Sequence, residues 1–317
     1  MSKHLLITGG AGFIGSNFID YILKNTTYSI TNIDALTYAG HINNMKTFNQ
    51  HRNYRFIQCD ISNGTSLKQV FDCDYEAIIN FAAESHVDRS IENAHPFIHT
   101  NINGTLNLLN AVLAGKAKKM IQISTDEVYG SLDQDSLPFT EYSQLASNNP
   151  YSASKASADL FVRSFHRTYQ LPLIITRCSN NYGPKQHLEK FIPKVITNAL
   201  NDQKIPLYGD GKHVRDWIFV DDHCRAIHTV LEHGDSGEVY NIGGGHEWTN
   251  KEVITLILDY LNKDYSLIEY VKDRKGHDRR YGINWGKIHK ELGWKPQVSF
   301  REGLIKTIEW YKTNYSQ

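Results

Sequence analysis

The side chains best suited to chemistry fall in two short segments, Thr125-Asp126-Glu127 and the Tyr-Ser-Ala-Ser-Lys run at 151–155. Residues four positions apart share one face of a helix, so a helix through Tyr151 places Lys155 beside it. A phenol has a pKa of about 10. To act as a base near neutrality, that pKa must fall by about 3, which corresponds to about 4 kcal/mol. Lys155 is one source of the positive charge that would lower it.

Asp126 and Glu127 directly follow an apolar stretch, residues 119–124, that predicts a buried strand. Neighbouring side chains on a strand point to opposite faces, so both carboxyl groups reach one substrate only if the chain leaves the strand there. Two carboxyl groups in one cleft repel, which favours one protonated and one ionised group, an acid and a base. The alternative is a plain helix start, at which acidic side chains stabilise the helix dipole.

A glycine-rich segment, residues 9–15, indicates what these groups work with. Its Gly10-x-Gly12-x-x-Gly15 spacing follows a predicted strand, opens a predicted helix, and precedes Asp34 at the end of the next strand. Such a turn lets the backbone approach a pyrophosphate, which the helix N-terminus attracts. Asp34 would accept hydrogen bonds from ribose hydroxyls and repel a 2′-phosphate, so the motif predicts NAD rather than NADP. An oxidised nicotinamide would add positive charge beside Tyr151. The alternative, a glycine turn that only packs a helix on a strand, is disfavoured by this context.

The elements that must position these groups alternate between apolar strands and amphipathic helices. The predicted strands of the first half are residues 4–8, 29–34, 55–59, 77–81, 119–124 and 173–177. Its predicted helices include residues 13–24, 96–114 and 151–169. This order predicts an α/β fold with a Rossmann-type, doubly wound parallel sheet whose ligand lies beyond the carboxyl ends of the strands.

The pattern changes after Ser179, where prolines and a Gly-Asp-Gly turn interrupt the alternation. We expect strands at residues 216–220 and 238–242, and helices at 250–261, 285–292 and 300–311. The sequence thus predicts an NAD-binding domain at residues 1–178 and a smaller α+β, mainly substrate-binding domain at 179–317, with 216–242 interleaved into the first.

Composition excludes several classes of function. The 317 residues carry 34 basic and 34 acidic side chains, a net charge of +0, which predicts no nucleic-acid or anionic membrane partner. Four scattered cysteines without a C-x-x-C motif favour a reduced, cytoplasmic location. Leu5-Leu6-Ile7 is too short for a signal peptide or a membrane span. None of the 15 histidines falls in a zinc motif, so we expect no metal.

The chain resembles the extended short-chain dehydrogenase/reductases that modify nucleotide sugars, and among them the nucleotide-sugar 4,6-dehydratases. The resemblance is carried by residues 9–15, 36–40, 82–90, 124–130, 151–155, 180–184, 214–217, 240–244, 273–281 and 292–296. Thr125-Asp126-Glu127 discriminates most, because sugar epimerases of the same branch lack this carboxylate pair.

The resemblance implies NAD-dependent conversion of dTDP-glucose to dTDP-4-dehydro-6-deoxyglucose, a step toward dTDP-rhamnose and other deoxysugars. Tyr151, assisted by Thr125 and Lys155, would take the proton of the C4 hydroxyl while hydride passes to NAD. Glu127 would remove the C5 proton and Asp126 would protonate the departing C6 hydroxyl, after which the hydride returns to C6.

Binding residues are predicted partly from their places after strands and partly from the resemblance. The predicted cofactor contacts are Gly9, Gly12, Phe13, Ile14, Gly15, Asp34, Asp60, Ile61, Ala82, Ala83, Thr100, Tyr151, Lys155 and Asn181. The predicted substrate contacts are Ser85, Thr125, Asn180, Glu189, Lys190, Arg215, Asn250, Asp273, Arg274 and His277. Arg215 is also favoured by chemistry, since a guanidinium binds a diphosphate with two parallel hydrogen bonds. Alternatively, residues 273–280 form an exposed charged loop.

Two other functions stay open from the sequence. A nucleotide-sugar 4-epimerase would use Tyr151 and NAD and leave Asp126 and Glu127 idle. A non-catalytic NAD-binding regulator could keep the glycines and lose Tyr151 and Lys155, so the presence of this pair together with the carboxylates argues against it. Family membership suggests a homodimer packed through helices such as 96–114 and 151–169. Amphipathic helices that cover a sheet show similar patterning.

Overall fold

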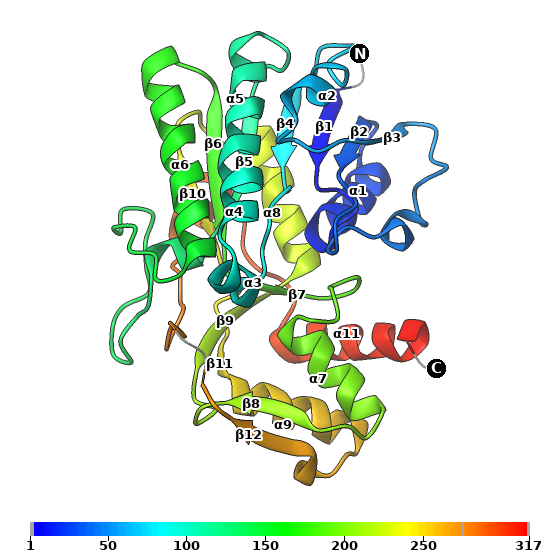
Figure 1. Ribbon diagram of the computed structural model, residues 1–317, viewed down its shortest axis with the longest axis vertical. Coiled ribbons are helices and arrows are strands. Elements are labelled where there is room, and N and C mark those ends of the chain that lie inside the picture. Colours follow the sequence, from blue (N-terminus) through cyan, green and yellow to red (C-terminus); the bar gives the residue numbers. More distant parts are fainter. Residues whose placement is uncertain (1–2, 274–275, 316–317) are drawn as a thin grey trace.

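A seven-stranded, all-parallel sheet forms the larger part of the molecule (Figure 1). The computed structural model describes residues 3–273 and 276–315. The strands run in the order β10-β6-β5-β4-β1-β2-β3. Their bounds are β1 (His4–Thr8), β2 (Ser29–Asp34), β3 (Tyr54–Gln58), β4 (Ala77–Asn80), β5 (Met120–Thr125), β6 (Leu173–Cys178) and β10 (Val239–Ile242). The strand order reverses between β1 and β4, where a doubly wound sheet binds its ligand. The predicted fold class is confirmed.

The sheet strands are mostly buried because helices cover both faces. On one face lie α1 (Phe13–Asn25), α8 (Val220–His233) and α10 (Gly286–Leu292), which share one apolar core. On the other lie α2 (Gly64–Lys68), α5 (Thr105–Leu113) and α6 (Pro150–Tyr169), which share a second core. Short connections are η1 (Ile42–Met45), α3 (Val87–Glu92), η3 (Asp126–Tyr129) and η4 (Tyr265–Leu267).

The predicted helix 96–114 is present as a continuous helical stretch over residues 95–113, but it is not α-helical throughout. The chain forms α4 (His95–Phe97), a π-helical stretch η2 (Ile98–Gly104) and then α5. Within the wider turn, the Asn101 side chain accepts from the Glu84 N–H and donates to the Ser154 hydroxyl, at 2.9 and 2.8 Å. These side-chain bonds reach residues on other elements, which periodicity does not reveal.

The smaller part consists of two short sheets and three helices around a third core. One sheet holds β7 (Asn180–Tyr182), β9 (Val214–Phe219) and β11 (Glu247–Thr249), and the other pairs β8 (Ile205–Tyr208) with β12 (Ile268–Val271). The helices are α7 (Phe191–Leu200), α9 (Asn250–Leu261) and α11 (Phe300–Tyr315). Within 216–242, β9 belongs to this part, whereas α8 and β10 return to the large sheet. The division at 178 and 179 stays a prediction.

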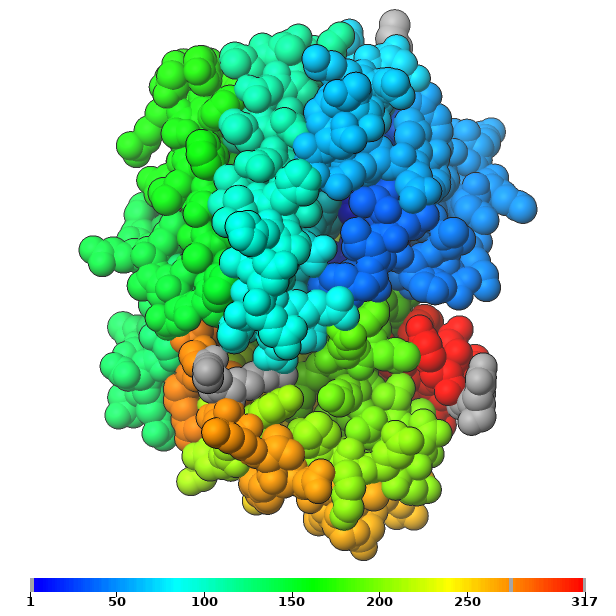
Figure 2. Space-filling view, in the orientation of Figure 1, coloured from blue at the N-terminus to red at the C-terminus, as the bar shows by residue number. Residues whose placement is uncertain are grey.

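The two parts lie one below the other, with the smaller part drawn from green to red in Figure 2. The carboxyl ends of the large sheet's strands point toward the smaller part (Figure 1). Within residues 3–273 and 276–315, no helix is long and apolar enough to cross a membrane.

Candidate active site

The glycine turn between β1 and α1 has the geometry of a phosphate cradle. Gly9 has φ +71°, and a Cβ there would lie 2.6 Å from the Ala82 backbone nitrogen. A Cβ at Gly15 would overlap the Gly9 carbonyl oxygen. Gly12 caps α1 without a side-chain hydrogen bond, so the first-turn N–H groups are left for an anion. The turn therefore fits a pyrophosphate.

Asp34 closes the same cradle from the end of β2. Its carboxylate accepts the Ala11 and Leu36 N–H groups at 2.9 and 2.8 Å, which fixes its orientation. Burial raises the pKa of Asp34, and these backbone bonds oppose the rise. A Cβ at Gly40 would lie 2.5 Å from the Asp34 carboxylate, so that position also needs glycine. A ribose diol fits here, whereas a 2′-phosphate does not.

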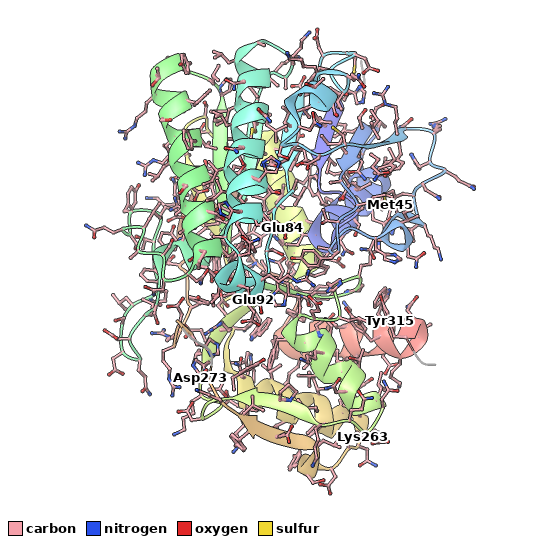
Figure 3. All side chains as sticks on the ribbon, in the orientation of Figure 1. Met45, Glu84, Glu92, Lys263, Asp273 and Tyr315 are labelled. Atoms are coloured by element: carbon pink, nitrogen blue, oxygen red, sulfur yellow. The ribbon has the colours of Figure 1, made fainter. Side chains whose placement is uncertain are left out.

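A cavity of about 300 Å³ extends from the cradle along the carboxyl edge of the sheet. All fourteen predicted cofactor contacts line it, so the residues present fit NAD; their individual roles stay predictions. Sequence reasoning missed further lining residues, among them Thr37, Cys178, Gln186 and His187, whereas Glu84 belongs to the predicted segment 82–90. Glu84 lies below β4 in Figure 3. Cys178 ends β6, and its place at a strand terminus was the available signal.

The carboxylate pair stands where the chain leaves β5. The strand ends at Thr125, and the 3₁₀ turn η3 begins at Asp126. The Thr125 hydroxyl accepts the Glu127 N–H and donates to the Asp126 carboxylate, both at 3.3 Å. Both carboxyl groups line the first cavity, as the proposed departure from the strand requires. The segment is also the start of a helical turn. The carboxylate pair in a cleft and the acidic helix start, which the sequence offered as alternatives, are therefore both present.

The two carboxyl groups differ in their surroundings. Burial raises the pKa of Asp126 well above its usual value, and the Glu127 and Asp216 carboxylates raise it further. Burial also raises the pKa of Glu127, but the Arg215 and Lys190 cations oppose that rise. Asp126 is thus the group that holds a proton, and Glu127 is the one that ionises more readily.

Tyr151 and Lys155 share one face of α6 and line the first cavity. Asn149 fixes the start of α6, because its side chain accepts the Ser152 N–H at 2.9 Å in a capping box. The Lys155 ammonium donates to the Ile123 carbonyl at 2.7 Å. The expected pair is therefore in place within the site.

The expectation that Lys155 lowers the pKa of Tyr151 needs correction. Burial and then the Glu127 charge raise this pKa well above its usual value, although a hydrogen bond from Thr125 opposes the rise. Burial also lowers the pKa of Lys155. Lysine charge alone does not offset the desolvation of the phenol. For Tyr151 to act as a base near neutrality, further positive charge, such as that of an oxidised nicotinamide, would be needed beside it.

A second cavity, of about 590 Å³, lies between the large sheet and the smaller part. Seven predicted substrate contacts line it: Ser85, Asn180, Glu189, Lys190, Arg215, Asn250 and His277. Thr125 lines the first cavity, whereas Asp273 lines neither cavity and contacts His277. Arg274 lies outside the described residues. Glu127 lines both cavities and so stands at their junction.

Arg215 is held rigidly at the wall of the second cavity. Its guanidinium donates to the Val214 and Asp278 carbonyls at 2.7 and 2.9 Å and lies 4.3 Å from the Tyr281 ring centroid. Lys190 donates to the Ser85 carbonyl at 2.8 Å. The wall is completed by aromatic residues that were not predicted as substrate contacts from the sequence: Phe191, Tyr208, Trp217 and Tyr281. Cations beside aromatic rings suit a nucleoside diphosphate.

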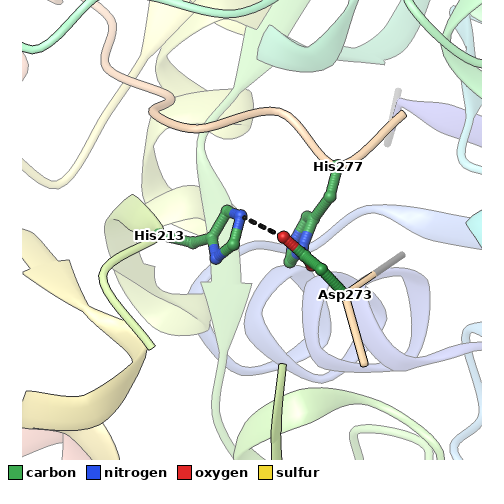
Figure 4. Close-up of side chains that lie close together, drawn as sticks. All are labelled: His213, Asp273 and His277. Atoms are coloured by element: carbon green, nitrogen blue, oxygen red, sulfur yellow. Dashed lines mark hydrogen bonds and ion pairs between the residues drawn. The ribbon is translucent and has the colours of Figure 1, made fainter. Parts of the chain in front are cut away.

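His277 belongs to a cluster with His213 and Asp273 (Figure 4). The Asp273 carboxylate contacts His277 Nδ1 at 2.7 Å and His213 Nε2 at 3.4 Å, and the two rings stack with centroids 3.7 Å apart. Burial lowers the pKa of His277 to about 4, although Asp273 opposes it. Near-parallel rings direct their in-plane lone pairs past one another, so this stack holds His277 in place more readily than it chelates an ion.

Comparison with known proteins agrees with this geometry. The model of a family described as GDP-mannose 4,6 dehydratase matches residues 6–307. The chain belongs to this dehydratase family. It is 50% identical to the low-salt glycan biosynthesis protein Agl12 of Haloferax volcanii, over 97% of this chain and 98% of that protein. It is 47% identical to a dTDP-glucose 4,6-dehydratase of Shigella flexneri, over 98% and 93%.

Solved structures place the chain in the same dehydratase family. The crystal structure of dTDP-glucose 4,6-dehydratase from Bacillus anthracis in complex with NAD matches with a TM-score of 0.92 and 51% identity, over 99% of this chain and 97% of that one. UDP-glucose 4-epimerase from Thermotoga maritima has the same fold, with a TM-score of 0.91 but 31% identity, over 99% and 100%. The resemblance expected from the sequence is confirmed.

Proposed function

We propose that this protein is an NAD-dependent dTDP-glucose 4,6-dehydratase that forms dTDP-4-dehydro-6-deoxyglucose and water. The observation that carries the proposal is the position of Glu127 at the junction of the two cavities, beside the buried Asp126. An epimerase has no task for either group. NAD, when bound, supplies the acceptor for the C4 hydride and the donor that delivers it to C6.

The proton steps are divided between two groups of residues. Tyr151 takes the C4 hydroxyl proton, with Thr125 beside its hydroxyl and Lys155 one helical turn away. The resulting 4-keto group acidifies the C5 proton, which Glu127 removes. Asp126 delivers its proton to the C6 hydroxyl, which leaves as water, and Glu127 then returns a proton to C5. The pKa values of Asp126 and Glu127, both raised by burial, suit a donor and a base near neutrality.

The walls of the second cavity support a nucleoside diphosphate-sugar as the substrate. Arg215, Lys190 and His277 surround the place for the diphosphate, and Asn180, Asn250 and Ser85 offer polar contacts to it and the sugar. The negative charge of Glu189 is balanced by Arg89, whose Nη2 lies 2.9 Å from the Glu189 carboxylate. The thymine specificity is proposed from the dehydratase relatives.

We also propose a homodimer that acts in the cytoplasm, with dTDP-rhamnose or another deoxysugar as the later product. Exposed apolar side chains on the neighbouring helices α5 and α6 support the dimer. The exposed fractions of Leu113, Leu160 and Phe161 are 43%, 55% and 38%. All four cysteines are free thiols, which suits a reducing compartment.

The deciding experiment uses dTDP-glucose carrying deuterium at C4. A dehydratase loses water and delivers the label to C6 of the product, whereas an epimerase returns it to C4 and a regulator leaves the sugar unchanged. Parallel assays with UDP- and CDP-glucose test the base specificity. Recovery of a C4 epimer alone would overturn the proposal.

A further inference from the structure

A buried ion pair joins α6, the helix of Tyr151 and Lys155, to the neighbouring strand β6. Arg177 is the one charged residue of β6, and its Nε donates to the Asp159 carboxylate at 2.9 Å. The two side chains are exposed by only 1% and 0%. Isolated buried pairs seldom stabilise a fold more than apolar residues of the same size would, so stability alone does not account for this pair.

The pair touches both catalytic segments. Asp159 lies on the face of α6 that carries Tyr151 and Lys155, at successive four-residue steps. On its other side, Arg177 Nη1 donates to the Tyr129 hydroxyl at 2.9 Å. Tyr129 is the last residue of η3, the turn that begins with the carboxylate pair.

Further contacts fix the Tyr129 end of this chain of interactions. The Tyr129 hydroxyl donates to the Asn241 side chain at 2.8 Å, and its ring stacks on Phe139 with centroids 5.1 Å apart. Asn241 belongs to β10, next to β6 in the sheet, so the hydroxyl is held between two strands. The ring also lies beside the guanidinium, 4.9 Å from ring centroid to Cζ.

We propose that Asp159, Arg177 and Tyr129 form a brace of positioning residues, which holds the acid and base of η3 in register with the redox pair on α6. The proposal rests on the proposed dehydratase function. A single substrate must meet Tyr151 at C4 and then Glu127 and Asp126 at C5 and C6 without leaving. A misplacement of about 1 Å costs roughly a hundredfold in rate, so a rigid link between the two segments has a direct catalytic value.

Tyr129→Phe tests the brace with the smallest change, because Arg177 keeps its partner Asp159. We expect reduced nicotinamide to form at nearly the wild-type rate when dTDP-glucose is added, and then to accumulate. Water loss and exchange of the C5 hydrogen with deuterated solvent should slow by about tenfold to a hundredfold. Tyr240→Phe is the matched control, because Tyr240 is also fully buried and its hydroxyl bonds elsewhere, to the Asp235 N–H at 3.2 Å.

Arg177→Lys is the second variant, since one ammonium keeps the charge and cannot bond both Asp159 and Tyr129 in the geometry of the guanidinium fork. It should show the same separation of oxidation from elimination. Equal slowing of both steps in both variants, or no effect on either, would refute the brace.

Amide hydrogen exchange supplies a measurement independent of turnover. In Tyr129→Phe, exchange in residues 126–130 should rise, while β9 stays protected as in the wild type and in Tyr240→Phe. Unchanged exchange at η3 would overturn the brace even if the wild type proves inactive on dTDP-glucose. In contrast, an inactive wild type refutes only the proposed function.

Discussion

The two cavities are built in different ways. The cofactor cradle is made mainly of backbone, since its shape depends on glycines at 9 and 15 and on N–H groups that fix Asp34. The second cavity is made of side chains from β9, α7 and the segment around His277. A backbone site tolerates no added carbon, whereas a side-chain site depends on charge and on fixed orientation.

The largest effect should come from Glu127→Gln, at the point where the two cavities meet. Loss of the base should slow water loss by about 10²–10⁴-fold, because that is the usual contribution of a positioned general base. NAD binding should be unchanged, since the amide keeps the shape of the side chain. Product assays and cofactor titration measure the two quantities, and unchanged turnover would refute the assigned role.

Gly15→Ala should show that the cradle depends on shape. Its Cβ would overlap the Gly9 carbonyl, so we expect NAD affinity to fall by about a hundredfold, an estimate from the usual cost of forcing atoms into a packed site. Gly64→Ala is the control, since a Cβ there comes no closer than 3.7 Å to a neighbour. Equal affinities for NAD in the two variants would contradict the backbone interpretation.

Arg215→Lys probes orientation in the side-chain cavity, because it keeps the charge and loses the fork. We expect about tenfold to a hundredfold weaker binding of dTDP, in line with the value of hydrogen bonds from a charged group. Calorimetric titration measures it. Arg279→Lys is the matched control, because this exposed arginine pairs with Asp210 at the surface. If Arg215→Lys and Arg279→Lys have the same affinity for dTDP, positive charge alone is sufficient for binding and the orientation of the guanidinium is not required.

The smallest effect concerns the pH dependence of stability at His277. Its folded-state pKa is lowered from 6.5 to about 4, so the unfolded chain binds the proton first as pH falls. The free energy of unfolding of the wild type should fall as the pH is lowered from about 6.5 to about 4. In His277→Gln the fall over the same range should be smaller, by on the order of 1–2 kcal/mol. Urea unfolding at several pH values tests this, with the exposed His99→Gln as control. Parallel pH profiles would disprove it.

The difference between a cradle built from backbone and a cavity built from side chains also explains which features could be predicted from the sequence. The cradle, Asp34 and the Tyr151–Lys155 spacing are local patterns, and their elements were placed to within one residue. Arg177, Tyr281 and the π-helical turn at Asn101 act through partners far away in the chain. The signal for the brace in the sequence is a single charged residue, Arg177, in a buried strand, and this signal does not indicate which residues Arg177 contacts.

The return of the chain to β10 has a consequence for folding. β10 covers β6, so a chain ending at residue 178 would present β6 as an open edge of unpaired backbone groups, ready to pair with another molecule. The seven-stranded sheet is therefore complete only after residue 242 has been synthesised. Until then, the unfinished sheet is a target for chaperones and for aggregation.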